Sequence, residues 1–320
     1  MRTASLFVCV AVASLSGTAS AQTIAGDASV QAQWFTGSLE APSPALPKAG
    51  LFAFEPYLIF QENSGAYGGN GDHHSVRNDT SLVDSVEVLK YGITDQLSVE
   101  ALPSFARISN DHSNFTGLGD LPVELEYRFN DEDNKTGFPS FTAALGMTFP
   151  TGDYNHLPKS LDGLGSGAYT LKEGILAQSL FDSWGHHPMR FRFYAEAFEP
   201  VANVSLSDIS SYGTGEGFQG SAMPGFSSEL GIGAGYGLDQ RWVLALDLVQ
   251  NFANGAHIRG AVGSIVDNSN APVSAGTAVA PAVEYNWSDS IGVIAGVEFT
   301  VAGRNTASYI APQVALAMSF

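Results

Sequence analysis

The sequence predicts an all-β protein, a single antiparallel transmembrane β-barrel of about 12 strands, and three observations support this fold. Segments of roughly ten residues in which apolar and polar side chains alternate recur along the chain, as expected of strands with one apolar face. The connections between these segments alternate between short and long, which is typical of barrels with short periplasmic turns and longer extracellular loops. The chain also begins with a segment that has the features of an export signal.

The alternating segments have the length that a membrane strand needs, because a ten-residue strand tilted by about 40° rises roughly 25 Å. The clearest is 120–129, where apolar residues alternate with Glu124 and Glu126. The last, 307–320, has mostly apolar even positions and small or polar odd positions, and it ends on Phe320. We expect its even face to contact lipid, and the strand to pair with the first and the penultimate strands. The strands are expected at 51–60, 81–91, 97–107, 120–129, 138–149, 168–181, 189–198, 225–238, 241–250, 277–287, 291–302 and 307–320.

Residues 1–21 fit a secretory signal peptide. Arg2 provides the positive charge, 6–15 the apolar region, and Ala19-Ser20-Ala21 a small-residue cleavage site. The apolar run is too short to span roughly 30 Å of hydrocarbon as a helix. Cleavage would leave Gln22 as the first residue of the mature chain.

Residues 22–50 form a leader ahead of the barrel, which is expected to occupy 51–320. Three prolines close together, Pro42, Pro44 and Pro47, disfavour regular strand pairing in the leader. We interpret it as a periplasmic extension or a partial plug.

Charge and cysteine content exclude several classes of function. The chain has 14 Lys and Arg against 32 Asp and Glu, a formal net charge of −18, so a nucleic-acid partner is not expected. Its one cysteine, Cys9, lies within the signal segment, which leaves no disulfide or thiol chemistry in the mature chain. The acidic balance fits a cation-preferring interior.

A soluble β-sandwich would show the same alternation, with the apolar residues in its core. Three features favour the membrane: the loops alternate in length, the last strand ends on an aromatic residue, and the polar faces are rich in glycine, which would enlarge the bore of a barrel. Aromatic residues also stand near strand ends, where girdles at the membrane interfaces are expected, at Phe149, Trp242, Tyr285 and Trp287.

Two short motifs carry a family resemblance. Gly117-Leu118-Gly119-Asp120 precedes a strand, and Phe149-Pro150-Thr151-Gly152-Asp153 closes the next hairpin. Together they resemble the MetA-pathway of phenol degradation family of outer-membrane β-barrels, which are often labelled transporters. The resemblance implies an outer-membrane channel or transporter for small solutes, with hydrophobic or aromatic compounds as candidates, and it carries over no catalytic residue. The motif positions are Gly117, Gly119, Asp120, Pro150, Thr151, Gly152 and Asp153.

These motifs and the histidines favour turn geometry over catalysis or metal binding. No helix and no twelve-residue calcium loop follows either motif, and adjacent histidines such as His73-His74 point to opposite faces of a strand. An outer-membrane phospholipase would need Ser and His on one lipid-facing strand, whereas all seven histidines fall in expected loops or turns. We therefore expect no enzyme activity, no cofactor and no metal, with the phospholipase as the least favoured alternative.

The charged residues on the inward faces are the main functional prediction. They indicate a narrow, cation-leaning lumen for small solutes, although a structural or adhesive barrel with a closed lumen would use the same charges as internal ion pairs. The expected partners are outer-membrane lipid, a small-molecule solute and the barrel assembly machinery, which would bind the C-terminal strand at Phe320. The candidate lumen-lining residues are Glu55, Glu100, Glu124, Glu126, Arg128, Arg190, Arg192, Glu196, Glu229, Asp247, Glu284 and Glu298.

Overall fold

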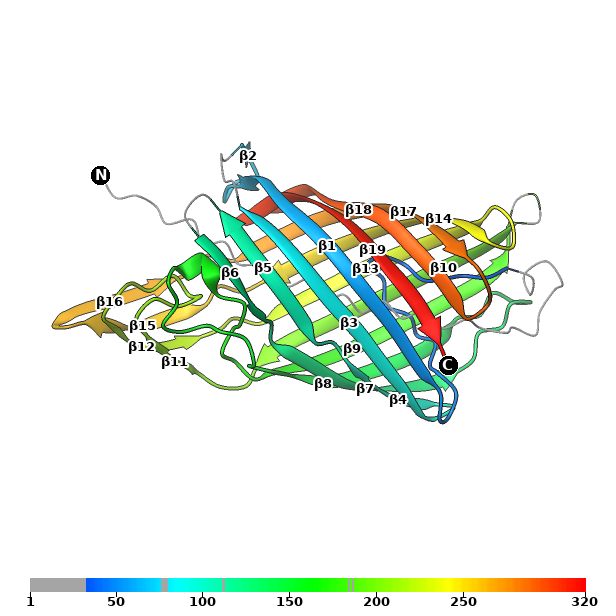
Figure 1. Cartoon of the computed structure of the whole chain (residues 1–320), viewed down its shortest axis with the longest axis horizontal. Helices are drawn as coiled ribbons and strands as arrows, with labels where there is room; N and C mark the ends of the chain where they lie inside the picture. Colours follow the sequence, from blue (N-terminus) through cyan, green and yellow to red (C-terminus); the bar gives the residue numbers. More distant parts are fainter. Residues whose placement is uncertain (1–32, 76–79, 111–112, 184, 186) are drawn as a thin grey trace.

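The predicted fold is confirmed by a computed structural model, which describes residues 33–75, 80–110, 113–183, 185 and 187–320. The predicted signal peptide and the first part of the leader lie outside the described residues. The chain forms a tilted, closed antiparallel sheet (Figure 1). No helix in the described ranges is long and apolar enough to cross a membrane.

The barrel wall has twelve strand positions, and two of them are each occupied by two shorter strands. The third position is occupied by β4 and β5 and the fourth by β6 and β7, because strand pairing is interrupted near Pro103 and Gly119. The bounds are β1 Phe52–Tyr67, β3 Ser81–Thr94, β4 Leu97–Ala101, β5 Ser104–Asn110, β6 Ser113–Leu118, β7 Leu121–Asn130, β8 Ser140–Phe149, β9 Thr170–Asp182, β10 Pro188–Pro200, β13 Ser227–Gly237, β14 Trp242–Ala253, β17 Ser274–Asn286, β18 Ile291–Arg304 and β19 Thr306–Ser319.

The last strand closes the sheet as predicted. β19 pairs antiparallel with β18 and, through Phe54 and Met318 among others, with β1. Its residues Ala311 and Ala315 are buried, whereas Ile310 and Val314 are exposed. Because β1 also pairs with β3, the sheet closes on itself, although β6 is paired only on its β5 side among the described strands.

The connections predicted as long loops contain more strand than expected. A second sheet of four short strands extends beyond one end of the barrel (Figure 1), in the order β11-β12-β15-β16. The intervals between the predicted strands at 199–224 and 251–276 were expected to be loops, and this expectation is wrong. It is also wrong for 108–119, which β5 and β6 largely fill. The short strands are β11 Val204–Ser207, β12 Phe218–Met223, β15 His257–Val262 and β16 Ile265–Asn270, with β2 His73–His74 beside β1 and a 3-10 turn, η1, at Ser160–Asp162.

The outer and inner faces of the barrel differ in polarity, as β14 illustrates. Leu244 and Leu246 are 46% and 53% exposed, whereas Asp247 is fully buried on the opposite face. Near one end of the barrel, Tyr285 packs against Trp242, with ring centroids 4.7 Å apart, and against Trp287 at 5.4 Å. An apolar belt bordered by aromatic rings is the surface that a bilayer solvates.

Candidate functional site

Part of the leader lies inside the barrel. Residues 33–47, which we call the strap, are buried apart from the half-buried Trp34 and Phe35. The Trp34 backbone N–H donates to the Gln240 carbonyl oxygen at 3.1 Å, in the β13–β14 turn. After the strap, the Gly50 N–H donates to the Gly92 carbonyl oxygen at 2.8 Å. Both ends of the strap therefore lie near the barrel end that carries the short turns.

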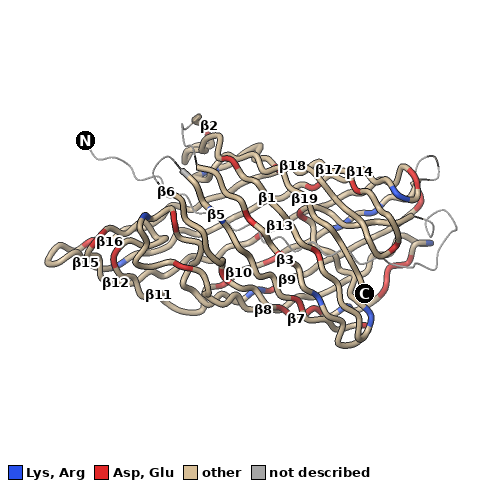
Figure 2. The backbone as a smooth tube through the Cα atoms, in the orientation of Figure 1, with Lys and Arg blue, Asp and Glu red and all other residues tan. Residues whose placement is uncertain are grey.

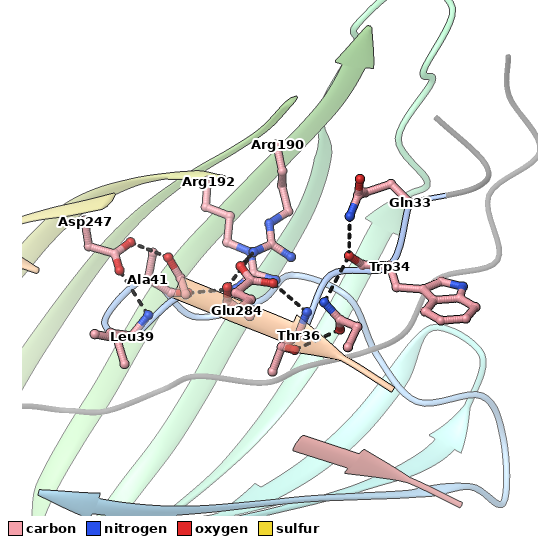
Figure 3. A network of polar contacts seen from close by, with 12 residues as sticks. Gln33, Trp34, Thr36, Leu39, Ala41, Arg190, Arg192, Asp247 and Glu284 are labelled. Carbon is pink, nitrogen blue, oxygen red and sulfur yellow. Dashed lines mark hydrogen bonds and ion pairs between the residues drawn. The ribbon is translucent and has the colours of Figure 1, made fainter. Parts of the chain in front are cut away.

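Charged side chains on the wall hold the first part of the strap (Figure 3). Glu284 on β17 accepts a hydrogen bond from the Thr36 N–H at 2.7 Å. The Arg190 guanidinium on β10 donates to the Gly37 carbonyl oxygen at 2.6 Å and to Glu284 at 2.9 Å. Arg190 also stacks over the Phe35 ring, 4.4 Å from its centroid. The buried Arg190–Glu284 ion pair of the wall thus receives further hydrogen-bonding partners from the strap.

A second set of contacts holds the turn of the strap. Asp247 on β14 accepts hydrogen bonds from the Ser38 hydroxyl and, at 3.0 Å, from the Leu39 N–H. Arg192 on β10 donates to the Ala41 carbonyl oxygen at 3.0 Å. Gln313 on β19 donates to the Glu40 carboxylate, so contacts reach the strap from several sides of the barrel.

Glycines on the inner face make room for the strap. A Cβ atom on Gly237 would lie 2.2 Å from the Gln33 Oε1 atom, and one on Gly292 would lie 2.0 Å from the Thr36 Oγ1 atom. A Cβ on Gly296 would lie 2.5 Å from a Leu39 methyl carbon. The space that these glycines leave is therefore occupied by the chain's own strap.

Buried charged side chains form a network that runs from strand to strand, from β3 to β10. The Lys90 ammonium lies 2.9 Å from Glu100 and 2.6 Å from Glu126. The Lys172 ammonium lies 2.6 Å from Glu124 and 3.1 Å from Glu196. Oxygens of Glu100, Glu124 and Glu126 also come within 4.8 Å of one another, close enough to share a cation. The two lysines already provide countercharge there, so we call these six residues the lysine–carboxylate network.

Three further inward carboxylates each accept a hydrogen bond from a tyrosine hydroxyl. The distances are 3.1 Å from Tyr57 to Glu55, 2.6 Å from Tyr194 to Glu229, and 2.9 Å from Tyr309 to Glu298.

Eleven of the twelve candidate lumen residues are buried among the described residues, and Arg128 is placed differently. Arg128 lies at the rim, where it donates to the Asp95 carbonyl oxygen at 3.0 Å and pairs with Asp131 at 3.2 Å. The remaining candidates divide among the strap contacts, the lysine–carboxylate network and the tyrosine pairs. Lys90 and Lys172 were not predicted to line the lumen, because apolar and polar residues alternate irregularly in their strands. Both nevertheless have the same strand parity as the inward-facing positions.

The two motifs at 117–120 and 149–153 meet and hold one loop. The Asp120 carboxylate accepts hydrogen bonds from the Gly152 N–H at 3.0 Å, the Ser166 N–H at 2.8 Å and the Ser166 hydroxyl at 2.7 Å. The Thr151 hydroxyl donates to the Gly119 carbonyl oxygen at 2.8 Å. The motifs thus fasten the β8–β9 loop to the break between β6 and β7.

Three of the histidines lie in strands rather than in the loops expected from the sequence. His73 and His74 form β2, and His257 begins β15. In the outer loops, the His156 Nδ1 atom lies 2.7 Å from the Asp208 carboxylate, and both side chains are exposed. His186 lies outside the described residues.

Comparison with known proteins supports the fold. No protein-family model matches the chain, and no curated protein matches it. Among solved structures, the chain is similar to the COG4313 outer membrane channel from Pseudomonas putida F1, with a TM-score of 0.61, 19% identity, and coverage of 86% of this chain and 97% of that one. It is also similar to the transport unit of the autotransporter AIDA-I from Escherichia coli, with a TM-score of 0.48, 13% identity, and coverage of 85% and 91%. The similarity to the COG4313 channel, together with the closed antiparallel sheet, shows that the fold is that of an outer-membrane β-barrel.

Proposed function

We propose that this protein is an outer-membrane channel for small solutes. The observation that carries the proposal is the closed barrel itself, with an exposed apolar belt outside and buried charges inside. A wall of this kind is stable in a bilayer and offers polar groups to a solute that crosses it. In this proposal the outer-membrane lipid solvates the belt, and β19 with Phe320 presents the barrel to the assembly machinery.

The inward charges favour cations over anions. Acidic residues outnumber basic ones over the whole chain, including the barrel strands (Figure 2). An excess of carboxylates along a lumen raises the local concentration of cations and repels anions. The buried carboxylates of the described barrel strands are Glu55, Glu100, Glu124, Glu126, Glu196, Glu229, Asp247, Glu284 and Glu298, against the basic Lys90, Lys172, Arg190 and Arg192.

In this proposal the strap is a partial plug. It enters the interior from one end and is held by hydrogen bonds to wall side chains, among them the buried Arg190–Glu284 ion pair, rather than by strand pairing. Such contacts exchange with water at modest net cost, so a segment of this kind can shift without unfolding the wall. Passage of a solute would require the strap to move aside or to leave a narrow gap.

Solute uptake into liposomes tests the proposal. Proteoliposomes of the mature chain are exposed to a panel of sugars, amino acids, inorganic cations and small aromatic compounds, and swelling is followed. The expected result is swelling with small cationic or neutral solutes, including hydrophobic or aromatic compounds, and slower swelling with anions of equal size. Absence of swelling with every solute would contradict the proposal.

A structural or adhesive barrel with a closed lumen is the second candidate. The strap inside the barrel and the four-stranded sheet beyond one end favour it, because one obstructs the interior and the other extends a surface into solvent. This candidate predicts no solute entry even for variants in which the strap is displaced.

A further inference from the structure

Part of the inner face is apolar where β1, β3 and β5 lie side by side. Ile59, Val86, Val88 and Leu102 are buried there and pack in one cluster with Leu39 of the strap. Ile108 on β5 is also buried. This face contrasts with the lysine–carboxylate network, whose charges lie mainly on β4, β7, β9 and β10.

Asp84 on β3 is a carboxylate that faces this apolar surface. Asp84 has the same strand parity as the buried Val86 and Val88, with continuous pairing of β3 to β1 through this stretch. It stands opposite Ile59 on β1 and opposite Ala106 on β5, and both are buried. Asp84 is therefore an inward acidic group among aliphatic neighbours.

The Asp84 carboxylate is only partly satisfied. It accepts a hydrogen bond from the Ser85 backbone N–H. Its Oδ1 atom is shielded from solvent and has no hydrogen-bond partner in the described ranges, and the carboxylate forms no ion pair there. A buried carboxylate oxygen without a donor is costly, so a ligand that supplies one is favoured.

The chemistry of this surface specifies the ligand. Aliphatic side chains favour an apolar body, and a carboxylate favours a donor, with a charged donor forming the stronger hydrogen bond. The Asp84 carboxylate itself repels carboxylates and other anions. We propose that Asp84, together with Ile59, Val86 and Ala106, forms a binding site for small apolar ammonium ions. The inference rests on the proposed function, since it names a class of solute for that channel.

β3 provides its own control. Glu87 is three residues from Asp84 and has the opposite strand parity, so it lies on the outer face, where it accepts a hydrogen bond from the Ser85 hydroxyl at 3.0 Å. Glu87→Gln removes a carboxylate from the same strand without changing the inner surface. Asp84→Asn removes the inner carboxylate and keeps its shape.

The test is calorimetric titration of the mature chain in detergent micelles with three compounds that share one apolar body: benzylammonium, benzyl alcohol and benzoate. Benzylammonium is expected to bind most tightly. The Asp84→Asn variant is expected to weaken its binding by about tenfold or more, and Glu87→Gln by less than about twofold. Benzyl alcohol is expected to bind more weakly and benzoate weakest.

A second variant protects the test from a folding defect. Ala106→Leu enlarges the side chain opposite Asp84 on β5 and is expected to weaken benzylammonium binding while the carboxylate remains. Folding of each variant is checked by the shift of unheated samples on denaturing gels. Unchanged affinity in Asp84→Asn, tighter binding of benzyl alcohol or benzoate, or no binding by the wild type would each overturn the inference. Because binding is measured without transport, a failure of the channel proposal is recognised separately by solute uptake.

Discussion

Arg190 on β10 donates a 2.6 Å hydrogen bond to the carbonyl oxygen of Gly37 in the strap. The same guanidinium pairs with Glu284 across the interior at 2.9 Å. A buried ion pair is stable only when its remaining hydrogen-bonding groups are satisfied, and here the strap satisfies them. The stability of this buried ion pair therefore depends on the strap.

Replacing Arg190 tests this dependence. Arg190→Met leaves Glu284 buried without its cation, and we expect the free energy of unfolding to fall by about 3 to 5 kcal/mol. Urea unfolding followed by gel mobility measures the change. Arg128→Met is the control, because Arg128 pairs at the rim with a largely exposed Asp131 and should cost less than about 1 kcal/mol. Equal losses in both variants would refute the dependence.

Small substitutions at glycine should displace the strap. Gly292→Ala introduces a Cβ atom 2.0 Å from the Thr36 Oγ1 atom, whereas Gly276→Ala places its Cβ 3.7 Å from Thr306, an ordinary contact. The chain's one cysteine lies in the predicted signal segment, so Ala45→Cys gives the strap a single thiol for labelling. We expect Gly292→Ala to speed maleimide labelling at position 45 by about tenfold, as an overpacking cost of 1 to 3 kcal/mol implies. Gly276→Ala should leave the rate unchanged.

The lysine–carboxylate network should respond to loss of its cations. Lys90→Met leaves Glu100 and Glu126 without their shared countercharge, and we expect a loss of about 3 to 5 kcal/mol in unfolding free energy. Adding Glu126→Gln should recover part of that loss, because one uncompensated charge is removed. A double-mutant cycle in guanidinium chloride measures the coupling. Additive effects would show that Lys90 and Glu126 do not act together.

Asp120 should control the β8–β9 loop. Asp120→Ala removes three hydrogen-bond contacts from Gly152 and Ser166, so the loop should open more often. We expect proteolysis within 153–165 to become severalfold faster, consistent with about 1 to 3 kcal/mol of lost hydrogen bonding. Asp153→Ala is the control, since the described hydrogen bonds to Asp153, from the Leu164 and Gly165 N–H groups, all reach its backbone oxygen, which the substitution keeps. Equal cleavage rates in the two variants would contradict this role.

One turn should show a defined pH dependence. Hydrogen bonds from the Arg241 and Trp242 backbone N–H groups lower the pKa of Asp239 from its ordinary value of 3.8. A lowered pKa stabilises the fold above the unfolded value, and that contribution is lost as the pH falls through the folded value. The wild type should therefore be more stable than Asp239→Asn at neutral pH, and the difference should shrink below about pH 4. A difference that is constant with pH would contradict this.

The sequence predicted the barrel wall well because membrane strands obey a local rule. Where Leu244, Leu246 and Leu248 alternate with small or polar residues, period 2 alone identifies both strand and face. β3 obeys the rule less clearly, because its inner face carries Val86 and Val88 as well as Lys90. Apolar residues on the inner face weaken the contrast on which the alternation depends.

The internal contacts were harder to predict because they join distant residues. Nothing in the sequence near Asp247 indicates that it accepts hydrogen bonds from the strap more than 200 residues away. The four-stranded sheet β11-β12-β15-β16 was not predicted for the same reason, since β12 pairs with the distant β15, with Gly220 opposite Gly260. A glycine on the inner face can make room for another segment of the chain, or it can leave the lumen wider. The sequence pattern is the same in both cases and does not distinguish them.

Current through single barrels tests the central claim most directly. The mature wild type and Gly292→Ala are recorded in planar bilayers under a potassium chloride gradient. If the channel prefers cations and is obstructed by its own strap, Gly292→Ala should have a higher conductance than the wild type. In both proteins the reversal potential should be displaced toward that of potassium. No conductance in either protein, or a reversal potential displaced toward that of chloride, would contradict the proposed function.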